Sequence, residues 1–458
     1  MQIRLPEEVK NIINELNRAG FEAYAVGGCV RDSLLGRTPK DWDITTSAEP
    51  LEVKRIFRRT IDTGMKHGTV TVMRKNTGYE VTTYRVDGAY ADHRRPESVT
   101  FTRRLSEDLL RRDFTINAMA YSEGDGLVDL YGGVSDLEKK IIRCVGDPDA
   151  RFGEDALRIM RAVRFSAELD FTIEPATREA AAKHAAELSE ISMERIETEL
   201  RKTLLSDHPE KLIDMSELGM TAVFLPEFDR LLATPQNTPY HMYDAGRHTV
   251  EVIRNVSKTK EMRYSALFHD IAKPDTRTTD EQGIDHFKGH PALGAEMAEP
   301  ILKRLRLDND TIQTVKKMTY WHDFGIKGDF GEKAFRRMLS KLGSEYFDRL
   351  MDLKQADMLG QSTYHREEAL KIMQCLRELK RQTDEKGAAL SIKALKINGK
   401  RLQELGIPAG PEMGRILNLL LEEVLEEPER NTPEWLENRV ALLLHAGGYD
   451  IGRGEKTD

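Results

Sequence analysis

The chain has 458 residues, of which 39% are hydrophobic and 32% charged, values that are ordinary for a globular protein of roughly two to four domains. No stretch approaches the ~18 consecutive apolar residues of a membrane-spanning helix, and the start MQIRLPEEVKNII lacks the charged-then-apolar pattern of a signal peptide. A membrane protein and a secreted protein are therefore excluded, and we expect a cytoplasmic location.

The charge and the cysteines narrow the class of protein further. The formal net charge of −8 argues weakly against a nucleic-acid partner, but six arginines between His93 and Asp113 form a locally basic strip. Such a run is most often a solvated face, although an acidic protein can also carry a basic cleft for a polyanion. The three cysteines are far apart and form no CxxC pair, which indicates a reducing compartment and neither a disulfide framework nor a zinc site.

Residues 1–145 alternate between helical and strand-like patterns. The first segment is amphipathic at helical spacing and stops at Gly20, and the next apolar segments are short and bounded by glycine and polar residues. The predicted elements are a helix over 6–20, strands over 21–28 and 41–46, and a hairpin over 68–86 that turns near Asn76–Gly78. This part therefore predicts an α/β domain built around a small mixed sheet.

From about Asp147 onward the strand signal fades, and apolar residues recur at helical spacing. The clearest helical segments cover 154–169, 175–191, 193–205, 413–428 and 432–447. Breaks fall near 234–240, 273–289, 382–391 and 406–410. The whole chain is therefore predicted to be an α+β protein, with an α/β head followed by an elongated and almost entirely helical remainder.

Asp41-Trp42-Asp43 is the first group of residues that suggests chemistry. On the predicted strand, the two-residue period places both carboxylates on one face. Two carboxylates a few ångströms apart repel unless a cation lies between them, and Mg²⁺ is the natural cation, although the pattern alone is more often a surface turn or a calcium contact. The upstream pair Gly27-Gly28 follows a strand and opens a helix, where backbone N–H groups approach phosphate and Arg31 can pair with it. The combined layout is more specific than either motif.

Five motifs follow one another along the chain: GGCVRD, KDWD, DGAYADHRRPESVTF, RRDFTINAM and EDALRIMRAVRF. Together they resemble the class II tRNA nucleotidyltransferases, which are the CCA-adding enzymes and their bacterial poly(A) polymerase relatives, through at least residues 20–220. The resemblance implies a metal-dependent enzyme that adds C, C and A to the 3′ end of tRNA from CTP and ATP. It also implies that Asp41 and Asp43 are the catalytic carboxylates and hold Mg²⁺.

The resemblance further implies nucleotide-binding roles near this pair. Arg112 matches the family arginine that contacts the incoming nucleotide, and Asp113 with Asn117 is placed to reach the ribose. Glu80 lies on a predicted strand where it is either a third carboxylate for the metal or an exposed strand charge. The predicted nucleotide-binding residues of the head are Gly27, Gly28, Arg31, Arg112, Asp113 and Asn117.

Asp155, Arg158, Arg161 and Arg164 lie three residues apart on a predicted helix, so successive side chains are neighbours. A carboxylate that accepts from an amino group, beside an arginine that donates to a ring nitrogen, fits the edges of C and A and fails against U and G. An isolated D-x-x-R is more often a salt-bridged surface helix. The resemblance places Asp155 and Arg158 in the selecting role, with Arg161 and Arg164 nearer the phosphates.

The segment Asp87–Pro96 resembles the family's flexible loop, which is needed for the switch from C to A addition and in which Gly88 supplies a hinge. Because the loop is intact, we do not expect a dedicated CC-adding enzyme. An enzyme that adds only the terminal A would keep the loop too, so this alternative stays open.

A second group combines four histidines and two aspartates from separate helical segments about 20 to 35 residues apart. Imidazole and carboxylate together suit a first-row divalent metal, and a carboxylate inside the apolar segment YSALFHDIAK needs a partner. The order of these residues resembles the HD superfamily of metal-dependent phosphohydrolases, including its two-metal members. The resemblance implies a divalent transition metal and phosphohydrolase activity on RNA ends; the alternative is a structural metal or a packed helical spacer. The six residues are His248, His269, Asp270, His290, His322 and Asp357.

The segment 391–428 resembles the C-terminal tail of CCA-adding enzymes, where helices hold the tRNA. Its basic residues serve phosphates or are ordinary surface charges; they are Lys393, Lys396, Lys400 and Arg401. The predicted domains are a nucleotidyltransferase head over 1–145, a helical neck over 146–235, an HD-type helical domain over 236–375 and a tRNA-binding tail over 376–458.

The expected partners are the tRNA 3′ end, CTP and ATP, with no membrane and no protein partner required. Three alternatives remain for the function. They are an enzyme that adds only A, a poly(A) polymerase, and an HD phosphohydrolase with a nucleotide-sensing head. An HD phosphohydrolase with a nucleotide-sensing head disagrees with a head in which all motifs are intact. A poly(A) polymerase would be expected to carry a long basic C-terminal extension.

Overall fold

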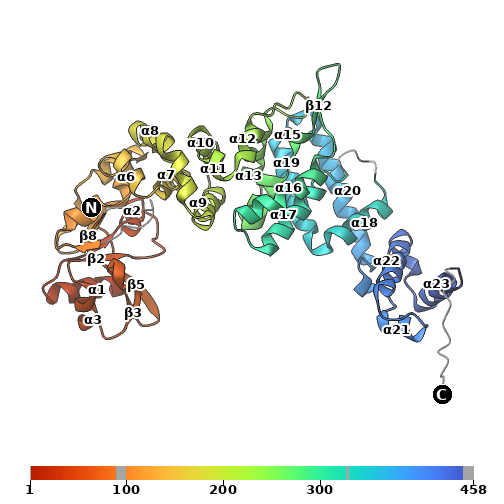
Figure 1. Cartoon of the computed structure of the whole chain (residues 1–458), viewed down its shortest axis with the longest axis horizontal. Helices are drawn as coiled ribbons and strands as arrows, with labels where there is room; N and C mark the ends of the chain where they lie inside the picture. Colours follow the sequence, from red (N-terminus) through yellow and green to blue (C-terminus); the bar gives the residue numbers. More distant parts are fainter. Residues whose placement is uncertain (1, 89–98, 326–327, 329, 447–458) are drawn as a thin grey trace. The chain divides into compact units, whose positions relative to one another are not determined.

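The computed structural model describes residues 2–88, 99–325, 328 and 330–446. Most of the predicted flexible loop over 87–96 lies outside the described residues. The chain forms two compact units, which comprise Met1–Ala233 with Pro300–Asp308 and Thr234–Glu299 with Asn309–Asp458 (Figure 1). Among the described residues, no helix combines the length and the apolar character needed to cross a membrane.

A seven-stranded sheet forms the centre of the first unit, and its strand order is β3-β4-β5-β2-β1-β8-β9. Neighbouring strands are antiparallel except for β2 and β5, which run parallel, so the predicted mixed sheet is confirmed. The bounds are β1 Ala23–Val26, β2 Ile44–Thr46, β3 Thr60–Gly64, β4 Thr69–Arg74, β5 Thr77–Thr83, β8 Met119–Ser122 and β9 Gly126–Asp129.

Helix α1 (Glu7–Arg18) covers part of this sheet because its apolar residues recur on one face. It buries Val9, Ile12, Ile13 and Leu16, and it ends before Gly20, whose φ of +91° suits glycine. The predicted helix over 6–20 is therefore confirmed. Helix α2 (Gly28–Leu34) starts directly after β1, as the glycine pair predicts.

The strand expected to carry both catalytic carboxylates is shorter than predicted. β2 begins at Ile44, so Asp41 and Asp43 lie in the segment just before it. The prediction that both aspartates belong to the strand is wrong, because only three residues there find partners on both neighbouring strands. The Val26 N–H still donates to the Asp43 carbonyl oxygen at 3.0 Å, which fixes Asp43 at the edge of the paired region.

Outside the seven-stranded sheet, the described part of the first unit is helical apart from two pairs of short strands. One pair is β6 (Arg85–Asp87) with β7 (Val99–Phe101), and the other is β10 (Ile141–Ile142) with β11 (Thr172–Ile173). The predicted helix over 154–169 is interrupted, because Asp155 and Ala156 separate α6 from α7. Strands β10 and β11 pair in parallel and flank this region. The helices are α6 Pro148–Glu154, α7 Leu157–Leu169, α8 Pro175–His184, α9 Met193–Leu205, α10 Lys211–Glu217, α11 Thr221–Phe224 and α12 Pro226–Leu232.

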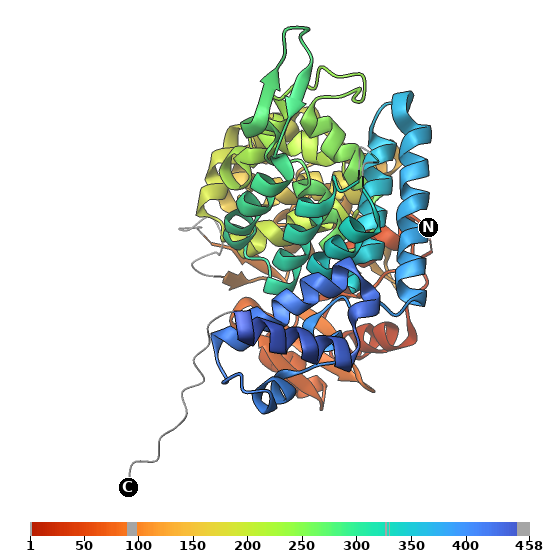
Figure 2. The same ribbon diagram turned by 90° about the vertical axis from the view of Figure 1, so that its right-hand side faces the viewer.

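The second unit is a bundle of helices from which the short β12–β13 hairpin projects (Figure 2). Helices α13, α14, α17 and α19 contact one another and form its centre, and α20 runs beside α19. The bounds are α13 Ala245–Asn255, α14 Lys260–Phe268, β12 Arg277–Thr279, β13 Asp285–Phe287, α16 His290–Arg304, α17 Asn309–Trp321, α18 Glu332–Leu342, α19 Phe347–Gly360 and α20 Arg366–Glu385.

The last three helices of this unit have their own apolar core. α21 (Gly399–Glu404), α22 (Pro411–Glu426) and α23 (Pro433–Ala446) bury Leu402, Leu420 and Leu436. The buried Arg336 side chain of α18 donates from Nε to the Leu425 carbonyl and from Nη2 to the Glu426 carbonyl, both at 2.8 Å. These bonds satisfy carbonyls at the end of α22 and attach it to the bundle.

Candidate active site and metal centre

The glycine turn between β1 and α2 allows two arginine side chains to approach the backbone. Gly27 has φ +81°, and a Cβ atom there would lie 3.1 Å from Nη1 of Arg112. A Cβ atom at Gly28 would lie 3.6 Å from Nη2 of Arg31. Two guanidinium groups therefore lie over the start of a helix, which is the place where phosphate oxygens are best received.

Asp108 anchors the arginine strip, although the sequence did not single it out. Its carboxylate is fully buried and accepts from Arg111 Nη2 at 2.7 Å, from Arg112 Nη2 at 3.3 Å and from the Thr45 hydroxyl at 3.1 Å. Burial alone would raise the pKa of Asp108, but Arg112 and Arg111 hold it below its ordinary value. Arg112 Nε has no hydrogen-bond partner among the described residues, so this guanidinium keeps capacity for a ligand.

A chain of hydrogen bonds joins four of the predicted nucleotide-binding residues. Asp113 Oδ2 accepts from Arg161 Nε at 2.8 Å and from its Nη2 at 2.5 Å. Asp113 Oδ1 accepts from Asn117 Nδ2 at 3.2 Å, and Asn117 Oδ1 accepts from Arg31 Nη1 at 2.7 Å. Burial alone would raise the pKa of Asp113, but Arg161 holds it well below its ordinary value. Asp113 and Asn117 thus position Arg161 and Arg31 at the rim of the glycine turn.

The three head carboxylates lie at one edge of the β2–β5 pair. In that parallel pair Ile44 is opposite Val81, so Asp43 and Glu80 stand one residue before the first pair on adjacent strands. Partial desolvation first, and then Glu80 and Asp41, raise the pKa of Asp43, while Arg112 opposes them. This mutual repulsion suits a hard divalent cation, since carboxylate oxygens are its preferred ligands. In the described part of the chain, the three carboxylates do not all come within 4.8 Å of one another.

The two predicted base-selecting residues are occupied by protein partners. Asp155 lies between α6 and α7, where Oδ1 accepts from the Leu157 N–H at 3.1 Å and Oδ2 from Arg195 Nη2 at 3.1 Å. Arg158 is buried and donates from Nη1 to Glu154 at 2.5 Å. The sequence did not indicate either partner. Glu154 supplies a carboxylate to Arg158, and Arg195 supplies a guanidinium to Asp155.

Arg164 shares the Phe165 ring with Arg161 of α7 and also reaches Glu199 of α9. It donates from Nε to Glu199 and from Nη1 to Glu168 at 2.7 Å, and its guanidinium lies 3.8 Å from the centre of the Phe165 ring. These contacts give Arg164 a packing role. Its predicted contact with the phosphates stays a prediction.

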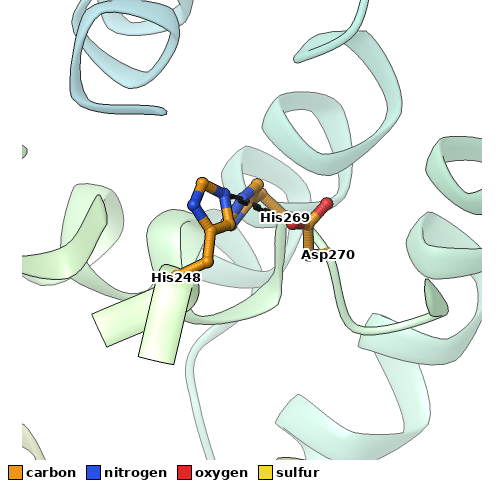
Figure 3. A group of neighbouring side chains, drawn as sticks. All are labelled: His248, His269 and Asp270. Carbon is orange, nitrogen blue, oxygen red and sulfur yellow. Dashed lines mark hydrogen bonds and ion pairs between the residues drawn. The ribbon is translucent and has the colours of Figure 1, made fainter. Parts of the chain in front are cut away.

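The six residues of the second group all meet in the second unit, on α13, at the ends of α14 and α17, at the start of α16 and on α19. We call them the HD cluster. His248, His269 and Asp270 form one set of three possible ligands, and Asp270, His290 and His322 form another. Within each set the ligand atoms lie within 4.8 Å of one another. Figure 3 shows the first set, with the two imidazoles meeting beside the Asp270 carboxylate. Asp357 joins through Oδ1, which lies 3.0 Å from His248 Nε2.

Backbone carbonyls orient the imidazoles of this cluster. The Nδ1 atoms of His269, His290 and His322 each lie 2.7 Å from the carbonyl of a residue three positions earlier. A carbonyl only accepts, so Nδ1 carries the proton and Nε2 of a neutral ring keeps its lone pair. The Nε2 atoms of His248 and His269 are 3.3 Å apart, and those of His290 and His322 are 3.2 Å apart. Two Nε2 atoms this close need a proton or a metal ion between their lone pairs.

Asp270 is a negatively charged carboxylate, and its charge favours a cation in the HD cluster. Burial alone would lower the pKa of His290, but its hydrogen bond to Asp270 raises that pKa above its ordinary value. Burial alone would raise the pKa of Asp270, but His269 and Lys273 hold it well below its ordinary value. Lys273 Nζ lies 2.6 Å from Asp270 Oδ2 but off the direction of a hydrogen bond, so this oxygen keeps a lone pair for a metal. The donor set fits two divalent ions that share Asp270.

Sequence reasoning missed several neighbours of the cluster. Lys273 follows Asp270 by three residues, a spacing that could have suggested contact, and its Nζ donates to Gln236 Oε1 at 2.6 Å. His241 lies edge-on to His248, seven residues further along the chain, with ring centres 4.9 Å apart. Lys354 donates to the His322 carbonyl at 2.6 Å. No local pattern indicates the Lys354 contact, because it joins segments 32 residues apart.

Comparison with known proteins agrees with the geometry of the head. The model of the Poly A polymerase head domain matches residues 23–143, “Probable RNA and SrmB- binding site of polymerase A” matches 170–232, and tRNA nucleotidyltransferase domain 2 matches 278–440. These matches define a nucleotidyltransferase, and they span both units.

The relatives specify the family. The CCA-adding enzyme of Levilactobacillus brevis is 36% identical over 421 residues, which cover 90% of this chain and 92% of that enzyme. The CCA-adding enzyme of Pediococcus pentosaceus is 36% identical over 439 residues, or 95% and 98% of the two chains. The crystal structure of the Bacillus stearothermophilus CCA-adding enzyme in complex with CTP superposes with a TM-score of 0.70 at 31% identity, covering 96% and 98%. The chain therefore belongs to the family of CCA-adding enzymes.

Asp108→Ala tests the anchoring of the arginine strip. The change leaves two partly buried guanidinium groups without the Asp108 carboxylate, so we expect the free energy of unfolding of the first unit to fall by about 2–3 kcal/mol. Asp62→Ala is the matched control, because Lys54 is the one ion-pair partner of that exposed carboxylate among the described residues and the pair is worth ~1 kcal/mol or less. Urea titration followed by circular dichroism measures both variants, and equal midpoints would show that Asp108 is not an anchor.

Proposed function

We propose that this chain adds C, C and A in turn to the 3′ end of tRNA, using CTP and ATP and no nucleic-acid template. One observation carries the proposal: relatives named CCA-adding enzymes align over 90% and 95% of the chain. The intact carboxylates, glycine turn and arginine strip supply the groups that the reaction needs.

In this mechanism the side chains of the head position two substrates. Asp41 and Asp43, with Glu80 beside them, would hold Mg²⁺, which when bound supplies positive charge at the reacting phosphate. Arg31 and Arg112 receive the triphosphate over the glycine turn. The 3′-hydroxyl oxygen forms a bond to the α-phosphorus while the bond to pyrophosphate breaks, and the arginines offset the charge that grows on the leaving group.

Base selection in this proposal depends on an exchange of partners by two residues. Asp155 leaves Arg195 and accepts from the amino group of C or A, and Arg158 leaves Glu154 and donates to the adjacent ring nitrogen. U and G present the reverse pattern, so both contacts fail. Each unmatched buried contact costs roughly 1–3 kcal/mol, which together give about 10²-fold discrimination.

Extension of tRNA transcripts that end at the discriminator base, in C, in CC or in CCA tests the proposed activity. With CTP and ATP we expect growth that stops at CCA, and Asp43→Asn is expected to lower the rate by roughly 10²-fold or more because a metal-holding charge is lost. Asp62→Asn, on an exposed strand of the same unit, should leave the rate unchanged. Extension from CC alone would instead mean an A-adding enzyme, and long adenosine tails would mean a poly(A) polymerase.

Asp155→Ala tests the selecting pair. The variant loses the carboxylate that accepts the amino group, so we expect misincorporation of UTP and GTP to rise by about tenfold relative to CTP and ATP. A single-turnover assay with each nucleotide measures the ratio. An unchanged preference would overturn the selecting role, whereas equal loss with all four nucleotides would make Asp155 a structural residue.

We also propose that the HD cluster holds two divalent transition-metal ions bridged by Asp270 and hydrolyses phosphate esters at RNA 3′ ends. The convergence of imidazole Nε2 atoms on a buried aspartate supports the metal site. The separate set that His290 and His322 form supports the second ion. The competing function is a structural metal that only stabilises the helices.

Metal analysis of His269→Ala and Asp270→Ala tests this second proposal. After desalting, the unchanged chain should retain about two equivalents of Mn²⁺ or Ni²⁺, and each variant should lose at least one, because a ligand to the metals is gone. His445→Ala, an exposed histidine on α23, is the control. Retained metal without hydrolysis of a 2′,3′-cyclic or 3′-phosphorylated RNA would favour the structural role. Absence of metal would overturn both roles.

A further inference from the structure

Three aromatic side chains lie together on the surface of the second unit. Tyr240 is 46% and Tyr364 is 66% exposed, and the His365 side chain is 42% exposed. Tyr240 lies 5.9 Å from Tyr364 and 4.9 Å from His365, and Tyr364 lies 4.7 Å from His365, measured between ring centres. We call these residues the aromatic cluster. An exposed group of large rings usually marks an interaction site.

Hydrogen bonds order this cluster before any ligand arrives. The Ser362 N–H donates to the Tyr240 carbonyl at 2.8 Å, and the Ser362 hydroxyl donates to the Pro239 carbonyl at 2.6 Å. His365 Nδ1 lies 2.5 Å from Glu368 Oε2, which fixes the orientation of the imidazole. Two chain segments more than a hundred residues apart are thus held side by side, so binding orders few additional groups.

Both segments lead directly to the HD cluster. His241 follows Tyr240 and lies edge-on to His248, with ring centres 4.9 Å apart. On the other segment, Gln361 Nε2 donates to Asp357 Oδ1 at 3.0 Å. Tyr240 and Tyr364 therefore lie eight and seven residues along the chain from His248 and Asp357, two ligands of the proposed metal site.

A basic residue follows the rings in sequence. Arg366 comes directly after His365 at the start of α20, and among the described residues it has no ion pair and its buried Nε has no hydrogen-bond partner. Exposed aromatic faces with an arginine one residue further along the chain suit a nucleotide, since a base can stack on the rings and a phosphate can pair with the cation. An apolar peptide would gain nothing from Arg366, and a paired duplex has no free base face to offer.

We propose that the aromatic cluster stacks unpaired bases at an RNA 3′ end and, with Arg366, presents the terminal phosphate ester to the HD cluster. The presentation rests on the metal site and the hydrolysis proposed above, whereas the stacking of bases does not. Aromatic stacking tolerates any base, so the site selects a single-stranded end and not a sequence.

Photo-crosslinking locates the RNA without relying on activity. The full chain is irradiated with a short single-stranded RNA that carries 5-iodouridine next to a 3′-phosphate, and the linked peptides are mapped by mass spectrometry. We expect crosslinks at Tyr240, Tyr364 or His365, in addition to those in the head. Crosslinks confined to other parts of the chain would overturn the proposal.

Substitutions then separate stacking from simple packing. Tyr240→Leu with Tyr364→Leu keeps apolar bulk but removes both π faces, so crosslinking at His365 and RNA affinity should fall about tenfold. Tyr240→Phe with Tyr364→Phe should stay within about twofold of the unchanged chain. Leu370→Ala, which removes an exposed side chain of α20, is the control. Equal binding by the leucine and phenylalanine pairs would overturn stacking.

Kinetics distinguish this proposal from that of hydrolysis. If the unchanged chain hydrolyses a 3′-phosphorylated RNA, the leucine pair should raise KM about tenfold and leave kcat within about twofold. A fall in kcat with an unchanged KM would overturn the presenting role. If the unchanged chain hydrolyses nothing, the phosphohydrolase proposal and the presenting role fail together, and crosslinking alone decides whether the bases stack.

Discussion

Carboxylates that meet at a distance of a few ångströms need positive charge between or beside them, and both candidate sites are organised by that requirement. In the head, Asp43, Glu80 and Asp41 repel one another at the edge of the sheet, while Asp108 in the interior is compensated by Arg111 and Arg112. Arg112 acts on both groups, because it helps to neutralise the buried Asp108 and also opposes the rise in the pKa of Asp43.

The sequence predicted those parts of the fold whose causes are local. A strand followed by two glycines and a helix was foreseen at Gly27 and Gly28, because only glycine accepts φ +81° with Arg112 so close. The break before Leu157 was not foreseen, because the Asp155 side chain takes the Leu157 N–H that a continuous helix would use. The strand predicted over 41–46 was longer than β2, because the length of β2 depends on its pairing with β1 and β5, which no local pattern encodes.

The site could be predicted as a set of residue types but not as a set of contacts. The six residues of the HD cluster are separated by many residues, and the helices bring all of them together as the motif indicated. The partner of Lys273 was not predictable, because Lys273 meets Gln236 only through the packing of segments 37 residues apart. His241 is only seven residues from His248, but their ring contact depends on the path of the loop before α13. The tyrosines at 240 and 364 show the same limit, since neither has a neighbour in sequence that marks it as functional.

The pairing of Asp155 with Arg195 and of Arg158 with Glu154 has a consequence for turnover. In the base-selecting role proposed for them, Asp155 and Arg158 act three times on one RNA, so each base has to be released as easily as it is bound. In that proposal Arg195 and Glu154 pair with them again when a base departs, so no buried charge is left uncompensated and release costs less. The resting contacts would then compete equally with every nucleotide, and the product would not stay bound.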